Sequence, residues 1–179
     1  MTGVPLDEFK RAMRGLPAQV AVVSSKSADV RIAMTATAVT SLSAEPPQLL
    51  VCIHQMARAA AVIKDAGAFA VNLLHTGQVD VANQCAMPNL EPENRFDIGS
   101  WTLSQNLGQP LLDQAIVNFE CSLTAQYKQG THSIFVGLIE QVRFEMGGRP
   151  LLYHDASYRE IGELLDALHL EWDNTFLAF

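Results

Sequence analysis

The residues best suited to chemistry lie in one segment of small hydroxyl and apolar side chains. Its sequence, MTATAVTSLS, covers residues 34–43 and is followed by Pro46 and Pro47. An extended chain with this alternation places its hydroxyls on one face. Small side chains would let a planar ring approach the backbone, whose N–H groups, with the hydroxyls, could hydrogen-bond the ring's oxygens and nitrogens. The same pattern also fits a half-buried edge strand with a Ser- and Thr-rich turn.

Familiar catalytic motifs do not occur in the sequence. Neither phosphate cradle, G-x-G-x-x-G or G-x-x-x-x-G-K-[ST], is present, and G-x-S-x-G and H-E-x-x-H are missing as well. A Rossmann dehydrogenase and a hydrolase of these types are therefore poorly supported.

The cysteines and histidines do not suggest a metal site. Cys52, Cys85 and Cys121 are odd in number and widely spaced, which fits neither a disulfide framework nor zinc ligands. We expect them to be small buried residues in a reduced cytosol. Four of the five histidines share no metal-ligand spacing; they are His54, His75, His154 and His169.

Composition limits the classes of partner. The chain has 179 residues and a net charge of −7, so a nucleic-acid partner is not expected. It is 49% hydrophobic and 17% charged, which suggests apolar surface buried against another subunit. The N-terminus lacks a signal-peptide pattern and no stretch is long and apolar enough to span a membrane, so we expect a cytoplasmic protein with one domain over residues 1–179.

Many short strands with a few short helices must position the candidate segment. Hydrophobic patterning predicts helices over residues 5–16, 58–66, 78–86 and 164–172. It predicts strands over residues 18–24, 30–36, 48–54, 68–74, 116–126, 132–144 and 151–153, with the run at 48–54 fully buried. Breaks are expected at residues 25–29, 41–47 and 87–99. This order favours a mainly β (α+β) fold with an antiparallel barrel over a βαβ sheet.

Several ordered motifs resemble one known family, the flavin reductase-like, FMN-binding split-barrel proteins. The segment MTATAVTSLSAEPPQLLVCI resembles that family's signature. FKRAMRGLPAQVAVVSS is similar to its opening helix and first strand, and FAVNLL to its next strand. Three later motifs follow in the same order: NRF, GTHSIFVGLI and PLLYHDASYR. The resemblance covers residues 6–160 and implies an antiparallel split β-barrel with short flanking helices.

The resemblance implies where the flavin would bind. Met34, Thr35, Ala36 and Thr37 would lie against the isoalloxazine ring, and Ser41 belongs to the same predicted flavin site.

The strand end with Cys52 and His54 and the turn through Ala57 to Arg58 would hold the ribityl phosphate. Similar sequences place hydroxyl residues in this turn, whereas here Met56-Ala57-Arg58-Ala59 leaves Arg58 as its one charged donor. This departure implies weaker flavin retention or a different flavin.

Other positions are carried over from the family in the same way. His132 matches a histidine near the nicotinamide and would orient it, although a histidine at a strand start is often only a satisfied polar residue. Phe96 would cover the flavin and Arg95 would contact a phosphate, or both would anchor the loop. Tyr153 would line the nicotinamide side, or would pack in the core or at an interface. Asn72, inside an apolar strand, is predicted to be structural.

The activity that the resemblance implies is hydride transfer from NADH or NADPH to FMN or FAD. The cofactor carries such chemistry while the protein aligns the two rings, so no protein nucleophile is expected. The family further implies a homodimer and reduced flavin supplied to a partner monooxygenase. Two alternatives remain open: an enzyme that keeps FMN bound and reduces another acceptor, and a flavin- or haem-binding carrier without catalysis.

Overall fold

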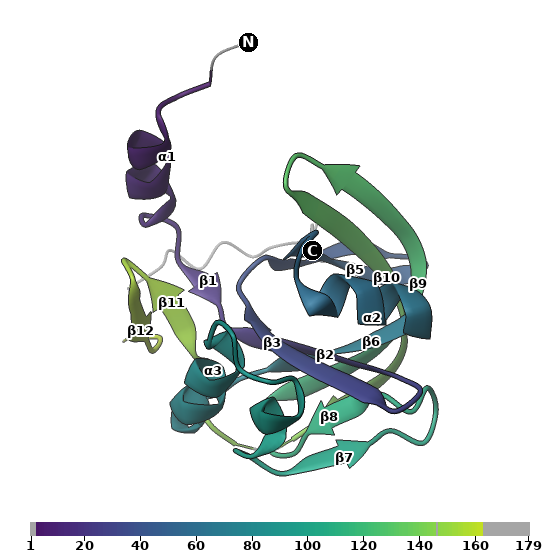
Figure 1. The fold of residues 1–179 in the computed structure, drawn as a ribbon. Coiled ribbons are helices and arrows are strands. Elements are labelled where there is room, and N and C mark those ends of the chain that lie inside the picture. Colours follow the sequence, from purple (N-terminus) through teal and green to yellow (C-terminus); the bar gives the residue numbers. More distant parts are fainter. Residues whose placement is uncertain (1–2, 146, 163–179) are drawn as a thin grey trace.

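A curled, seven-stranded antiparallel sheet dominates the computed structural model, which describes residues 3–145 and 147–162 (Figure 1). The strand order is β3-β2-β6-β9-β10-β5-β4. The strands are β2 (Ala21–Ser27), β3 (Val30–Ala36), β4 (Val39–Ala44), β5 (Pro47–His54), β6 (Ala68–Leu73), β9 (Val117–Gln129) and β10 (His132–Phe144). Strands β3 and β4 follow one another in sequence yet lie at opposite edges of the sheet, so the barrel is split between them.

Smaller elements surround this sheet. Strand β1 (Ala18–Gln19) joins β11 (Leu152–His154) and β12 (Ser157–Arg159), and β7 (Trp101–Leu103) pairs with β8 (Pro110–Leu112). The helices are α1 (Leu6–Met13), α2 (Arg58–Ala66) and α3 (Val79–Ala86), with 3-10 turns η1 (Thr76–Gln78) and η2 (Glu93–Phe96). None of the helices in the described ranges is long and apolar enough to cross a membrane.

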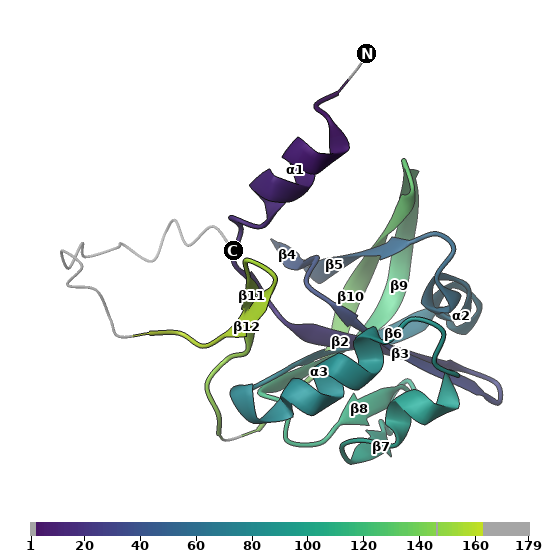
Figure 2. The same ribbon diagram turned by 60° about the vertical axis from the view of Figure 1, so that its left-hand side comes forward.

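Strand β2 is buried on both faces because a helix covers each one. Ala21 and Val23 belong to a hydrophobic cluster that includes Ile63 of α2. Val22, on the opposite face, belongs to a second cluster that includes Ala82 of α3. In Figure 2, α3 lies in front of β2 and β3 while α2 lies beyond the other side of the sheet. The alternation of side chains along a strand thus gives each helix its own set of core contacts.

Asn72 has the structural role that the sequence predicts. Its Nδ2 donates to the Val22 carbonyl (2.9 Å) and to the Ser24 hydroxyl (3.0 Å). Its Oδ1 accepts from the Leu112 N–H (2.9 Å) and from Asn118 Nδ2 (2.7 Å). Because every polar atom of this fully buried amide is paired, burial carries no unsatisfied-group cost.

The mainly β, antiparallel prediction is confirmed, with local corrections. The break expected at 25–29 begins only at Ala28, because β2 continues to Ser27 through its pairing with β3. The break expected at 41–47 is wrong over its first half, where β4 pairs with β5 as far as Ala44. Strand β5 is buried on one face alone, since Leu50 and Cys52 are half-buried.

Three short strands were not predicted, and one predicted helix lies beyond the described chain. Strands β7, β8 and β12 have only three residues each, too few for a periodic pattern. The helix expected over residues 164–172 falls outside the described residues.

Candidate functional site

A cavity of about 690 Å³ separates α1 from the barrel and contains the bend at which β3 gives way to β4. Thr37 and Ala38 form this bend, and both are exposed. Two other walls complete the cavity. One comes from α1 and the residues that follow it in sequence: Phe9, Lys10, Met13, Arg14, Leu16, Pro17 and Ala18. The other comes from β11 and the β11–β12 turn: Tyr153, His154, Asp155 and Ala156. A space of this size is within the range of small-molecule sites.

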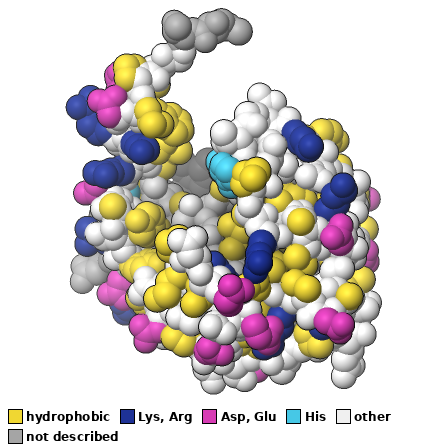
Figure 3. Space-filling model, viewed as in Figure 1, with side chains coloured by type: hydrophobic (Ala, Val, Ile, Leu, Met, Phe, Trp, Pro, Cys, Tyr) yellow, Lys and Arg dark blue, Asp and Glu magenta, His cyan; other side chains and the backbone are white. Residues whose placement is uncertain are grey.

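Helix α1 presents its apolar face to this cavity instead of to the core. Leu6, Phe9, Met13 and Leu16 recur at helical spacing, yet no residue of the helix is buried. Figure 3 shows hydrophobic side chains of α1 turned toward the barrel across a hollow. The amphipathic pattern was visible in the sequence, but nothing in it indicated that the apolar face would line a cavity.

The predicted ring-contacting segment divides its side chains between the fold and the cavity. Thr35 Oγ1 donates to the Ala82 carbonyl of α3 (2.6 Å), and Ala36 is buried in the core. Met34 is half-buried against the same core cluster. Thr37 alone among these four reaches the cavity beside α1. Within residues 3–145 and 147–162, β3 is an edge strand, and its outer side pairs with no other strand.

Ser41 lies in a different cavity. It is exposed on β4 and lines a separate space of about 440 Å³. The walls of that space are mostly apolar and include Leu49, Phe119 and Ile139. The structure therefore separates Ser41 from the cavity that Thr37 lines.

The two histidines of the predicted site meet across β5 and β10. His54 and His132 are direct register partners, and their ring centroids are 5.2 Å apart with the rings nearly perpendicular. His54 Nδ1 accepts a hydrogen bond from the Met56 N–H (3.2 Å). His132 Nδ1 is 2.9 Å from the Thr131 hydroxyl. Both side chains are exposed and can reach a ligand.

Backbone bonds connect these histidines to the β3–β4 bend. The Cys52 N–H donates to the Ala38 carbonyl (3.0 Å), so β5 lies directly beside the bend. Gln55 Nε2 donates to the Gly130 carbonyl (3.0 Å) and the His132 carbonyl (2.9 Å), which fixes the turn after β5 to the β9–β10 hairpin. Sequence reasoning missed Gln55, whose role depends on the strand register.

The turn between β5 and α2 leads into a helix N-terminus that has hydrogen-bond donors available for an anion. Ala57 is the N-cap residue, and no side chain caps the helix and no acidic residue occupies its first turn. Arg58 extends from the first helical position, where its Nη1 is 3.4 Å from Glu91 Oε2. Its side chain is 71% exposed, so a phosphate could replace this weak ion pair. Free N–H groups at a helix start favour anions.

Arg95 and Phe96 have structural partners elsewhere, and neither lines the cavity beside α1. The Arg95 guanidinium donates to the Cys85 carbonyl and to the Met87 carbonyl (2.6 Å), at the C-terminal end of α3. Phe96 is buried, packs edge-on against Trp101 with centroids 4.9 Å apart, and has the Arg31 guanidinium 4.1 Å above its ring.

Tyr153 is 39% exposed and lines the cavity beside α1. Its ring meets that of Tyr158 edge-on, with centroids 5.6 Å apart. Burial, and next to it the neighbouring Tyr153, raises the pKa of the Tyr158 phenol. The Tyr158 hydroxyl therefore stays protonated around neutral pH and remains a hydrogen-bond donor.

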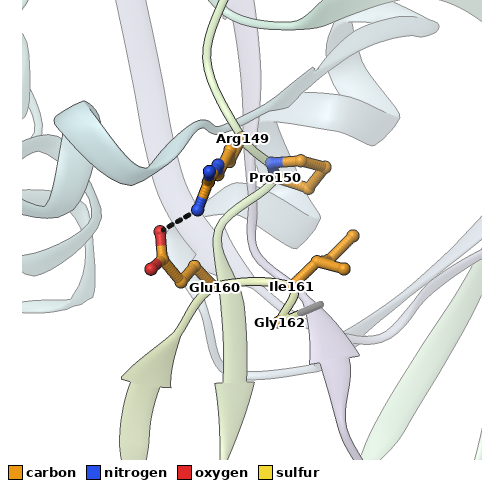
Figure 4. Close-up of a pocket in the computed structure, with 5 residues that line it drawn as sticks. All are labelled: Arg149, Pro150, Glu160, Ile161 and Gly162. Carbon is orange, nitrogen blue, oxygen red and sulfur yellow. Dashed lines mark ion pairs between the residues drawn. The ribbon is translucent and has the colours of Figure 1, made fainter. Parts of the chain in front are cut away.

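A further cavity, of about 430 Å³, lies next to β11 and β12. Figure 4 shows Arg149 and Glu160 pointing toward one another across it, joined by an ion pair of 3.6 Å. Pro150, Ile161 and Gly162 complete its lining, and none of the predicted site residues is among them.

Comparison with known proteins finds flavin reductases both by sequence and by structure. FMN reductase (NADH) RutF of Agrobacterium fabrum is 33% identical over 152 residues, which cover 85% of this chain and 86% of that protein. The reductase component of the FADH(2)-dependent resorcinol hydroxylase of Rhizobium sp. is 35% identical over 84% of each chain. The structure of the NADH:FAD oxidoreductase SgcE6 of Streptomyces globisporus C-1027 superposes with a TM-score of 0.81 at 27% identity, covering 91% of this chain and 98% of that one. Residues 13–162 match the family described as flavin reductase like domain, and the chain belongs to that family.

Proposed function

We propose that the protein is an NAD(P)H:flavin oxidoreductase that transfers hydride from NADH to FMN or FAD. The observation that carries this proposal is the family match over residues 13–162. Proteins similar to this chain are named FMN reductase (NADH) and NADH:FAD oxidoreductase, which supports NADH as the donor and a flavin as the acceptor.

The residues beside α1 suit two stacked rings. The cavity of about 690 Å³ has aromatic and apolar walls from Phe9, Met13 and Tyr153. At its edge, the exposed bend at Thr37 and Ala38 offers backbone polar groups of the kind that the pyrimidine side of a flavin requires. The flavin supplies the hydride-accepting chemistry when it is bound.

The remaining task of the protein is alignment. Thr37 and Tyr153 bound the space in which the two rings must face one another, and restricting their orientation raises the effective concentration of the reactants. The apolar face of α1 would exclude water from the space between the two rings. His132 would hydrogen-bond the nicotinamide, and the turn from His54 to Arg58 would hold the flavin phosphate. No side chain is needed as a nucleophile.

We further propose that the reduced flavin leaves the protein for a partner monooxygenase. One similar protein is the reductase component of a resorcinol hydroxylase, and its name describes that division of labour. The phosphate turn of this chain lacks hydroxyl side chains, so it favours a flavin that is held loosely and released.

The exposed apolar face of α1 supports a homodimer as the working form. Leu6, Phe9, Met13 and Leu16 are between 45% and 66% exposed, and a second copy of the chain packed over the cavity would bury the part of this face that the bound rings leave exposed. Three free thiols, at Cys52, Cys85 and Cys121, agree with a reducing cytoplasm.

The test is steady-state oxidation of NADH and NADPH by the purified protein, with and without added FMN, FAD or riboflavin. Turnover that requires added flavin supports a diffusible-flavin reductase. Turnover by a protein that retains its flavin through gel filtration, and needs a further acceptor, would replace this proposal with a bound-flavin enzyme. Flavin binding without any oxidation of NADH would instead indicate a carrier.

A further inference from the structure

Two cationic side chains, Lys10 on α1 and Arg14 at its C-cap, line the cavity beside the barrel. Lys10 and Arg14 lie one helical turn apart, next to the apolar stripe that Phe9 and Met13 form on the same helix. The cavity wall therefore combines apolar surface, suited to a ring, with two cations at its rim. This combination matches a nucleotide, which carries a flat base and a phosphoryl group.

Charge in this part of the molecule differs from that of the whole chain. The chain carries a net charge of −7, whereas the cavity lining has two cations against one carboxylate, Asp155. None of the ion pairs formed within residues 3–145 and 147–162 involves Lys10 or Arg14. Like charges one turn apart on a helix repel one another, and an anion bound between them would relieve that repulsion.

The backbone holds this end of α1 to the opposite wall of the cavity. The Asp155 N–H donates to the Arg14 carbonyl (3.1 Å), which connects the segment behind α1 to the β11–β12 turn. Asp155 and Ala156 adopt left-handed backbone conformations, with φ of 47° and 56°, so the turn directs their side chains away from the usual strand faces. The bond from Asp155 to Arg14 holds the backbone at Arg14 next to the turn that follows the strand of Tyr153.

We propose that Lys10 and Arg14 form a phosphoryl-binding subsite for a nucleotide that enters this cavity. The proposal rests on the proposed function, because it concerns the ligands of the same reaction. The phosphoryl group belongs either to the dinucleotide that donates hydride or to the flavin nucleotide. A second anion-favouring position, at Arg58 and the start of α2, does not line this cavity, so the two ligands need not compete for one subsite.

The test compares a Lys10→Gln/Arg14→Gln double variant with an Arg11→Gln control. Arg11 is on the same helix and has the same charge, but it does not line the cavity. Each protein is assayed with NADH and with N-benzyl-1,4-dihydronicotinamide, a donor without phosphate, and with FMN and riboflavin as acceptors. Circular dichroism verifies that α1 is retained.

We expect the double variant to raise KM for NADH roughly three- to tenfold at low salt, with little change in kcat. The effect is modest because each of the two solvent-exposed charge contacts contributes little binding energy. The benzyl donor and the Arg11→Gln control should be unaffected. An effect on FMN that is missing with riboflavin would assign the subsite to the flavin phosphate. The proposal is overturned if the KM values for NADH and FMN are both unchanged, if the phosphate-free compounds are affected equally, or if Arg11→Gln has the same effect.

Failure of this proposal can be told apart from failure of the proposed function. If the wild-type protein oxidises no NADH, the function is wrong, and the subsite is then tested by titrating FMN and riboflavin fluorescence with the same variants. Binding of FMN that the double variant leaves unchanged would then overturn the subsite as well.

Discussion

Replacing Arg58 with alanine should weaken the binding of FMN and leave the binding of riboflavin unchanged. A charge-assisted hydrogen bond contributes about 1.5–3 kcal/mol when it is shielded from water. Arg58, however, is 71% exposed and already lies 3.4 Å from Glu91. An exposed ion pair contributes only about 0.2–1 kcal/mol. We therefore expect a loss near the top of that exposed range, about 1 kcal/mol, or roughly a fivefold higher Kd for FMN.

Titration of flavin fluorescence with protein measures both affinities directly. Glu91→Gln should strengthen FMN binding by about twofold at most, because it frees Arg58 from its present partner. Lys64→Ala is the matched control, since Lys64 is an exposed cation in the last turn of the same helix. If Arg58→Ala binds FMN and riboflavin with unchanged affinity, or loses both equally, Arg58 does not contact the phosphate.

Three further outcomes follow from the site and its surroundings. His132→Ala should raise KM for NADH more than it raises Kd for flavin; equal effects on both ligands would argue against a nicotinamide contact. Arg95→Ala should lower stability by about 1.5–3 kcal/mol, because it removes donors to two backbone carbonyls at the end of α3, and thermal melting tests this; weaker flavin binding at an unchanged Tm would instead indicate a phosphate ligand. Burial raises the pKa of the Cys85 and Cys121 thiols to about 12, so at pH 8 their thiolate fraction is on the order of 0.01% and a thiol reagent should modify only Cys52 in the native protein. Rapid modification of more than one thiol would contradict that burial, and protection of Cys52 by flavin would support its place at the site.

The sequence predicted the elements with strong periodic patterns. Strand β3, helix α2 and strand β10 begin and end at the predicted residues, because each has a clear hydrophobic pattern and a clear stop signal. Gly67, which adopts a φ of +63° after α2, shows how such a stop works: the left-handed conformation ends the helix at little cost for glycine.

Errors occurred where tertiary pairing overrode local composition. The Ser-rich residues of β4 have the composition of a loop, yet pairing with β5 holds them in a strand. Tertiary packing also placed the predicted site residues in different surroundings. Thr35 and Thr37 look equivalent in sequence, but one donates to α3 and the other lines the cavity. Which hydroxyl reaches a ligand depends on what packs against each face of β3, and the local sequence does not contain that information.

The role of α1 could not have been inferred from its own residues. An amphipathic helix ordinarily packs its apolar face on the core. Here Phe9 and Met13 instead border a space of about 690 Å³, whose opposite wall comes from residues far away in sequence, among them Thr37 and Tyr153. Long-range placement of this kind appears only once the strands are paired.

The most direct test of the central claim is the rate of NADH oxidation by the purified protein as FMN or FAD is added. We predict a negligible rate without flavin and a saturable increase with it, accompanied by anaerobic bleaching of the flavin absorbance. A rate that does not respond to any flavin would contradict the assignment of this protein as a flavin reductase.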